Sequence, residues 1–282
     1  MTNKIIRDVI DDSERAFYNL KNKTLINCSF KGDADGESAL KESRNIKVID
    51  SEFHLRYPLW HTQRFSLDNV FMADTCRAPL WYSKNGVIKN SNITGVKALR
   101  ESKNIEILDS NIESTEFFWK CSNIRIKNSK IVGEYPFLES KNIELDNIEL
   151  SGKYSFQYVS KLSISNSKLY TKDSFWHAKD VLVKDSYIKA EYIGWYSDNL
   201  TFINCVIEGI QPFCYAKNLK LINCKMINAN LSFEYSSVDA DIVGHIDSIK
   251  NPLKGRIIAD SIGEIIKDNP VYECNATILI RK

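Results

Sequence analysis

The feature that most constrains this chain is an apolar position that recurs every 19 residues between Ala98 and Met226. The residues at this position, here called anchors, are Ile107, Ile126, Leu145, Ile164, Val183, Phe202 and Leu221. Earlier anchors are Ile88, Leu67, Val48 and Leu25, at spacings of 19, 21, 19 and 23 residues. A fixed period of this length, carried by β-type residues, predicts a solenoid of stacked turns.

Asparagine or aspartate occupies two further positions of the repeat. Two residues after the anchors stand Asn27, Asp50, Asn69, Asn90, Asp109, Asn128, Asn147, Asn166, Asp185, Asn204 and Asn223. Three residues before the anchors stand Asn22, Asn45, Asn85, Asn104, Asn123, Asn142, Asn199 and Asn218, with Asp180 in line. Both residue types tolerate the left-handed conformation that a turn between strands requires. Side-chain amides stacked about 4.8 Å apart can also bond the turns on either side, which predicts an asparagine ladder.

The remaining apolar positions define the strands. Residues alternate around the anchor, as in Ile105-Glu106-Ile107, which predicts a half-buried strand. Apolar residues five positions after the anchor predict a second strand. A third strand is predicted at Leu40, Leu59, Leu80, Leu99, Phe118, Phe137, Phe156, Phe175 and Phe213. The predicted fold is all-β, a single-stranded right-handed parallel β-helix of about 12 coils of ~19 residues with three strands per coil. Residues 1–12 are expected to form an N-terminal cap or partial coil, 13–242 the β-helix, and 243–282 a C-terminal cap and tail.

Composition excludes several classes of function. The formal charge of +2, with 26% charged residues, provides no basic field of the size that nucleic acid requires. No segment approaches the roughly 18 apolar residues of a membrane helix. The charged start, MTNKIIRDVIDDSERAF, lacks the apolar run of a signal peptide, so we expect a cytoplasmic protein. The 7 cysteines show no CxxC or CxxH spacing, and we predict neither a metal site nor a cofactor.

Four segments resemble a known family. They are FHLRYPLWH (53–61), CRAPLWYSKN (76–85), the repeated ESKNI and GRIIADSIGEI (255–265). Together they resemble an uncharacterised bacterial domain-of-unknown-function family with a pectin-lyase-like right-handed parallel β-helix. The resemblance extends over essentially the whole chain and implies the fold but no activity. The wider pectin-lyase-like superfamily is rich in polysaccharide lyases and hydrolases, which implies carbohydrate by analogy only.

The 5 tryptophans all lie seven residues before an anchor. If Leu99 and Phe118 in the preceding slot point inward, alternation turns the tryptophans outward into an aromatic strip. Such a strip is suited to sugar rings or to a protein interface. The alternative is that the slot is interior and the rings pack in the core, although Lys41, Arg100 and Gln157 also occupy it. The predicted ligand-binding residues are Trp60, His61, Trp81, Tyr82, Trp119, Trp176, His177, Trp195 and Tyr196.

Charged residues beside the strip are the second group of candidates. Glu116, Glu134, Asp173 and Glu191 lie ten or eleven residues before their anchors. Asp173 and Glu191 fall in adjacent coils, where their side chains could approach to about 5 Å, the separation that retaining glycosidases use. Arg56 and Arg77 share a slot in neighbouring coils and could bind a carboxylate or phosphate. The alternative for all of these is ordinary solvated charge.

Two functions are compatible with these patterns. The favoured one is a non-catalytic binding or scaffold β-helix whose aromatic strip binds a glycan-like ligand or a protein partner, including a second copy of the chain. The other is a carbohydrate-active enzyme of hydrolase or lyase type, with Asp173, Glu191 or Glu134 as acid or base. No Ser-His-Asp, phosphate-loop or dinucleotide motif is present. We expect neither nucleic acid nor a membrane as a partner.

Overall fold

A computed structural model describes residues 4–282, so the first three residues of the predicted N-terminal cap lie outside the described part of the chain. The chain divides into two units, Met1–Glu144 and Leu145–Lys282, which are described separately below. Residues 4–282 contain strands and turns but no helix. Accordingly, none of the described segments is a helix of the length and apolarity that crossing a bilayer would require.

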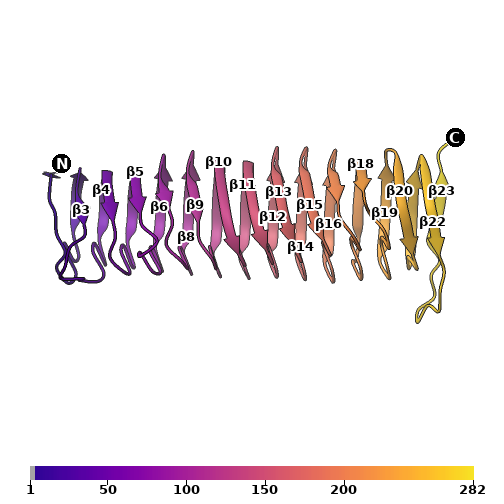
Figure 1. Cartoon of the computed structure of the whole chain (residues 1–282), viewed down its shortest axis with the longest axis horizontal. Coiled ribbons are helices and arrows are strands. Elements are labelled where there is room, and N and C mark those ends of the chain that lie inside the picture. Colours follow the sequence, from indigo (N-terminus) through magenta and orange to yellow (C-terminus); the bar gives the residue numbers. More distant parts are fainter. Residues whose placement is uncertain (1–3) are drawn as a thin grey trace. The chain divides into compact units, whose positions relative to one another are not determined.

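The first unit is built from short parallel strands that lie side by side (Figure 1). Each anchor pairs with the anchor of the next turn, as Val48 does with Leu67 and Ile88 with Ile107. Its strands are β1 (Lys4–Arg7), β2 (Lys21–Ile26), β3 (Ser29–Phe30), β4 (Arg44–Phe53), β5 (Gln63–Met72), β6 (Lys84–Lys89), β7 (Asn92–Ile93), β8 (Lys103–Leu108), β9 (Asn111–Glu113) and β10 (Ser122–Glu134). Strand β11 (Lys141–Lys153) spans the division between the units.

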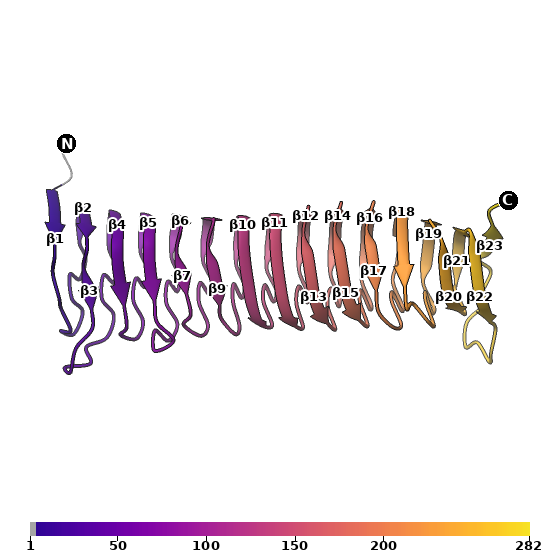
Figure 2. The same cartoon turned by 45° about the horizontal axis from the view of Figure 1, so that its top comes forward.

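The second unit repeats the same arrangement, seen from another side in Figure 2. The parallel register joins Ile164 to Val183 and Val183 to Phe202, and it continues from Ala240 to Ile257 and Ile278. The strands are β12 (Ser160–Ser165), β13 (Lys168–Lys172), β14 (Lys179–Lys184), β15 (Tyr187–Glu191), β16 (Asp198–Ile203), β17 (Val206–Glu208), β18 (Leu219–Ile227), β19 (Ser237–Ile242), β20 (His245–Lys250), β21 (Lys254–Ala259), β22 (Ser261–Ile266) and β23 (Thr277–Ile280).

The predicted class, an all-β parallel solenoid, is confirmed, but the number of turns is corrected. Residues 4–282 form about 15 turns, where the sequence predicted about 12. Parallel pairing includes β1 near the start of the chain and reaches β21 and β23 near its end. The turn of β21 has Lys254 and Ala259 where other turns have Asn or Asp, so the repeat was not recognised there. The turn of β1 does carry such a residue, Asp8, which is left-handed and accepts the Asn27 amide at 2.7 Å.

The core of each unit is a set of columns of like residues. The anchors are fully buried, as are the phenyl rings eight residues before them, such as Phe118 and Phe137, whose centroids lie 5.7 Å apart. A column of small polar residues lies beside them, also buried. The Ser110 hydroxyl donates to the Leu108 carbonyl at 2.7 Å and accepts the Ser91 N–H at 3.1 Å. The buried hydroxyl of Ser110 is therefore satisfied by main-chain groups, as a packed interior requires.

The asparagine positions adopt the left-handed backbone that the sequence predicts. The φ angle is 50° at Asp109, 49° at Asn128 and 56° at Asn104. Their side chains are hydrogen bonded between turns: the Asn128 amide donates to Asp109 at 3.0 Å, and the Asn104 amide donates to Asn85 at 2.7 Å. At Asn104 and Asn128, asparagine thus supplies both the conformation and a lateral hydrogen bond.

Each turn of the solenoid was predicted to contain three strands. The third of these segments, which contains Leu99 or Phe118, forms a side of the turn that is not a strand. Here every second residue has a positive φ, for example Lys97 (60°), Leu99 (60°) and Glu101 (52°). The N–H groups still reach the neighbouring turns, from Leu99 to the Pro79 carbonyl at 3.0 Å and from Glu101 to the Trp119 carbonyl at 2.9 Å. This side, called the turn side below, is hydrogen bonded like a sheet but is not extended.

Because the turn side is not a strand, burial along it does not alternate. Phe117 and Phe118 are both buried, Trp119 is half-buried, and Lys120 is exposed. The expected inward position of Leu99 and Phe118 is confirmed. The two-residue alternation used to place the tryptophans is wrong for this side, since consecutive residues instead move stepwise from the core to the surface.

Candidate functional site

The aromatic residues singled out by the sequence lie on the turn side, where the backbone is least favourable. A left-handed residue other than glycine costs roughly 1–2 kcal/mol and persists only where its surroundings hold it. Trp81 stands between two such residues, Leu80 (φ 62°) and Tyr82 (φ 60°). Strained backbone of this kind is often retained at functional positions, which makes the turn side the first place to look for a site.

The tryptophan position is neither core nor open surface, because all of its indole rings are half-buried. Each indole N–H donates to a main-chain carbonyl of the next turn within its own unit. Gln157 occupies the same slot and makes the equivalent bond to the Asp173 carbonyl at 3.0 Å. The tryptophan bonds run from Trp60 to Ala78 (2.6 Å), Trp81 to Lys97, Trp119 to Tyr135 (2.7 Å), Trp176 to Tyr192 (2.7 Å) and Trp195 to Gln211 (2.9 Å).

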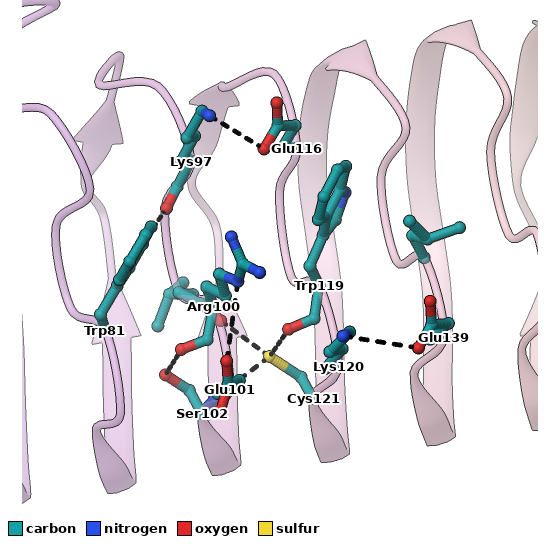
Figure 3. Close-up of polar contacts among 12 residues, drawn as sticks. Trp81, Lys97, Arg100, Glu101, Ser102, Glu116, Trp119, Lys120, Cys121 and Glu139 are labelled. Carbon is teal, nitrogen blue, oxygen red and sulfur yellow. Dashed lines mark hydrogen bonds and ion pairs between the residues drawn. The ribbon is translucent and has the colours of Figure 1, made fainter.

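In the first unit, cations and tryptophans form one continuous stack. Trp60 and Trp81 are parallel, with an interplanar angle of 6° and centroids 5.3 Å apart. The Arg100 guanidinium lies 5.2 Å from the Trp81 ring and 5.5 Å from the Trp119 ring, as Figure 3 shows. Lys41 covers Trp60 at 5.5 Å. Each such cation–π contact contributes about 0.5–2 kcal/mol, so this row stabilises the packing of successive turns.

This stacking limits what the tryptophans can bind. Their faces are covered by the neighbouring ring or cation, and Trp176 and Trp195 in the second unit are likewise parallel, 5.4 Å apart at 5°. Between stacked partners, only ring edges face the solvent. A sugar that stacks on an aromatic face therefore needs a place where the row is interrupted.

The adjacent position carries a second row of rings that is more exposed. In the first unit His61 stacks on Tyr82 at 4.8 Å. In the second unit the row is longer and is called the tyrosine row below: it comprises Tyr158, His177, Tyr196, Tyr215 and Tyr235, with centroid spacings of 4.8, 5.2, 4.8 and 5.4 Å. Tyr158 and Tyr196 are 53% and 47% exposed, whereas Tyr235 is only 8% exposed.

The tyrosine row ends in a groove of about 560 Å³. Tyr196 and Tyr215 are stacked at 11°, but Tyr235 is tilted by 43° from Tyr215, and Tyr272 meets Tyr235 edge-on at 84°. The parallel stacking thus ends at this point, and the rings of Tyr196, Tyr215, Tyr235 and Tyr272 all line the groove. The lining comprises Tyr196, Tyr215, Ala216, Lys217, Asn218, Tyr235, Ser237, Leu253, Lys254 and Tyr272.

A change in the repeat explains why the row stops here. The Tyr235 N–H donates to the Asn251 carbonyl at 3.0 Å, which brings Pro252 into the position of the next ring. Proline carries no ring that extends the stack. Tyr272 comes instead from the loop between β22 and β23, drawn in yellow in Figure 2. This loop is held by the Val271 N–H, which donates to the Tyr235 hydroxyl at 3.3 Å.

The predicted carboxylates lie near the start of the turn side. Asp173 is 9% exposed, and burial raises the pKa of its carboxyl, with the nearby charge of Glu191 adding to the effect. Glu191 is exposed and pairs with Lys172 at 3.0 Å. Glu134 belongs to the first unit and Asp173 to the second. Among residues 4–282, no cluster of three or more His, Cys, Asp or Glu side chains is arranged to hold a metal ion.

The predicted anion-binding arginines differ in their surroundings. Arg56 already pairs with two carboxylates, Asp35 at 3.0 Å and Glu37 at 2.9 Å. Arg77 is exposed, and its carbonyl accepts the Tyr57 N–H. An external anion at Arg56 would therefore have to compete with carboxylates already bound there.

The sequence predicted the aromatic rows on the turn side but not the groove at the end of the tyrosine row. Of the predicted ligand-binding residues, Tyr196 lines the groove. Tyr272 gave no signal, because it belongs to a loop outside the repeat. Lys217 and Lys254 gave none either, since exposed lysines recur along the whole chain.

Comparison with known proteins places the chain in a family. The family model described as "Protein of unknown function (DUF3737)" matches residues 4–280. The chain belongs to this family. The resemblance inferred from the sequence, a domain-of-unknown-function family with a pectin-lyase-like parallel β-helix, is confirmed. No curated protein matches the chain.

Several solved structures align with this DUF3737 member over most of its length. The surface adhesin PfbA of Streptococcus pneumoniae is 10% identical, with a TM-score of 0.55 over 84% of this chain and 85% of that one. The periplasmic alginate epimerase AlgG is 10% identical over 92% and 77% of the two chains, with a TM-score of 0.29. The A-module of the mannuronan C-5 epimerase AlgE4 of Azotobacter vinelandii is 10% identical over 97% and 88%, with a TM-score of 0.32. The likeness to PfbA shows the parallel β-helix fold and nothing beyond it.

Proposed function

We propose that this DUF3737 member is a non-catalytic carbohydrate-binding β-helix whose ligand lies in the groove at the end of the tyrosine row. The observation that carries the proposal is the opening of the ring stack between Tyr215, Tyr235 and Tyr272. Within the two aromatic rows, neighbouring rings or cations cover both faces of internal rings such as Trp81 and His177. In the groove, a pyranose ring has aromatic surface to contact.

The chemistry of the lining fits a sugar better than an apolar ligand. The Tyr196 and Tyr272 rings, 47% and 55% exposed, offer apolar surface with a hydroxyl at the end. Ser237 accepts the Asn218 N–H through its hydroxyl oxygen at 2.8 Å, which leaves the hydroxyl proton to donate. A volume of about 560 Å³ also falls within the range of roughly 300–1,000 Å³ typical of small-ligand sites.

A binding role on a similar fold exists in PfbA, which is named a surface adhesin. This is an analogy of fold only, and it supports a binding β-helix without indicating a ligand.

A glycan array tests the proposal with two matched variants. Tyr272 contacts Tyr235 edge-on at 5.2 Å and is 55% exposed, while Tyr170 contacts Tyr187 edge-on at 5.9 Å and is 39% exposed outside the groove. We expect the wild type and Tyr170→Ala to retain the same glycans, and Tyr272→Ala to lose them by about tenfold or more. Absence of any glycan bound by the folded wild type, or equal binding by both variants, would reject the proposal.

A carbohydrate-active enzyme is the second candidate, favoured by one observation. Burial raises the pKa of the Asp173 carboxyl, as general acids in glycosidases require. Release of reducing sugar from a polysaccharide, lost in Asp173→Asn but retained in Tyr170→Ala, would establish this alternative.

A further inference from the structure

The groove carries positive charge that no carboxylate of its lining balances. Lys217 and Lys254 both line it and are exposed, while every other lining residue is uncharged. Throughout the described residues 4–282, neither lysine forms an ion pair.

Two of the acidic residues near the groove are ion-paired with cations outside it. Glu234 pairs with Lys250 at 2.9 Å, and Asp239 is 3.5 Å from Arg256. Asp198 accepts the Asn218 side-chain amide at 3.0 Å. Glu273 follows Tyr272 in the loop but does not line the groove. Asp198 is the bridge partner of Lys217 in the preceding turn, so its carboxylate offsets part of the Lys217 charge. Lys217 and Lys254 remain the charged side chains of the groove lining itself.

The groove continues beyond the tyrosines into a hollow lined by Lys220 and Lys254 together with Asp239, which is 3.5 Å from Arg256. This second hollow, of about 260 Å³, shares Asn218, Ser237 and Lys254 with the groove and extends over β18, β19 and β21. Gly255 lines this hollow and allows the two turns to approach closely: a Cβ at this residue would lie 2.0 Å from the Val238 carbonyl oxygen, and its φ of 104° strains other residues. Two connected hollows suit an extended ligand of more than one ring.

We infer that the groove selects an acidic saccharide, an oligomer whose rings carry carboxylates. The inference rests on the proposed function and adds the ligand's charge to it. The tyrosine faces take a sugar ring, while Lys217 and Lys254 meet carboxylates on that ring and on its neighbour. Because both lysines are exposed, each contributes modestly, and the preference for an acidic over a neutral ligand weakens as salt rises.

Titration calorimetry with two matched ligands tests the inference. The acidic probe is a trimer of galacturonic acid, and the neutral probe is its carboxyl-reduced galactose counterpart. At low ionic strength we expect the acidic trimer to bind the wild type about three- to tenfold more tightly than the neutral trimer, and the preference to shrink at 0.5 M salt. The double variant Lys217→Gln/Lys254→Gln should lose the preference and keep its affinity for the neutral trimer. Lys168→Gln, an exposed lysine on β13, is the control and should behave as wild type.

The outcomes separate the inference from the function on which it rests. Equal affinity for both trimers, or a preference that survives in the double variant, overturns the acidic selection while carbohydrate binding stands. Failure of both trimers to bind the folded wild type, when a glycan array also finds no ligand, overturns the proposed function itself. A hexaglutamate peptide that displaces the acidic trimer at equal charge would identify a general anion patch and overturn the saccharide part of the inference.

Discussion

Replacing Asn104 tests the physical reason for the repeat. Asn104 has a φ of 56°, donates to Asn85 at 2.7 Å and accepts from the Asn123 amide at 2.7 Å. Alanine at this position loses both side-chain bonds and must adopt the left-handed conformation with a Cβ that has no compensating contact. Glycine loses the same bonds but adopts that conformation freely. The pair of variants therefore separates the two contributions.

The expected magnitudes follow from the exposure of the site. Two exposed hydrogen bonds contribute about 1 kcal/mol together, and the left-handed backbone adds about 1–2 kcal/mol for alanine. Asn104→Ala should lower the free energy of unfolding by about 2–3 kcal/mol, and Asn104→Gly by about 1 kcal/mol. For a chain of this size the melting temperature should fall by about 4–10 °C and 2–4 °C respectively.

Thermal unfolding followed by circular dichroism measures both effects. Lys103→Ala, an exposed neighbour on β8, is the control and should melt within about 1 °C of wild type. If the alanine and glycine variants melt together, the left-handed backbone is not what selects asparagine. If both melt like wild type, the lateral hydrogen bonds do not stabilise the stack either, and the reasoning fails.

Three further predictions concern single residues. Gly95→Ala places a Cβ 1.9 Å from the Cys76 carbonyl oxygen and should lower the free energy of unfolding by about 1–3 kcal/mol in urea denaturation; an unchanged midpoint would contradict the close contact. Glu52 has a pKa of about 2, below its usual 4.5, chiefly because Lys31 donates a hydrogen bond to its carboxylate. The ionised carboxylate therefore stabilises the folded state above pH 4.5, and this stabilisation is lost as the pH falls towards 2. Glu52→Gln should therefore unfold about 1 kcal/mol more easily than wild type at pH 7 and equally at pH 2, whereas a constant difference would refute the linkage. Burial raises the pKa of Asp173 above the usual 3.8, so the ionised carboxylate destabilises the folded state. Asp173→Asn should therefore raise the melting temperature at pH 7 but not at pH 3. A lower melting temperature at pH 7 would contradict this prediction.

The fold was largely readable from the sequence because it depends on positions with strict local requirements. Asparagine at Asn104 and Asn128 marks a left-handed corner that few other residues tolerate, and buried anchors such as Ile107 mark the strand between corners. The turn side was wrongly predicted to be a strand, because its left-handed positions are not marked by Asn or Gly. Leu99 and Phe118 are left-handed without being Asn or Gly, so their sequence looked like a strand, and only packing between turns holds them in place.

The site was only half readable, for a related reason. The rows containing Trp81 and Tyr196 follow the repeat and could be aligned by counting. The groove exists where the repeat fails: Pro252 interrupts the tyrosine row, and Tyr272 returns to it from a loop with no periodic spacing. A method that reads periodicity finds the regular surface and misses the irregular place where ring faces open. The periodicity also predicted that the tryptophan rings point outward, whereas Trp60 stacks on Trp81 and Trp176 on Trp195 in neighbouring turns.

Saturation-transfer difference NMR, with the aromatic protons of the protein irradiated, tests the central claim most directly. The sugar ring protons of the galacturonic acid trimer should receive saturation from the wild type and from Tyr170→Ala, and markedly less from Tyr272→Ala. No transfer from the wild type, or undiminished transfer in Tyr272→Ala, would contradict a ligand lying against the opened tyrosine faces.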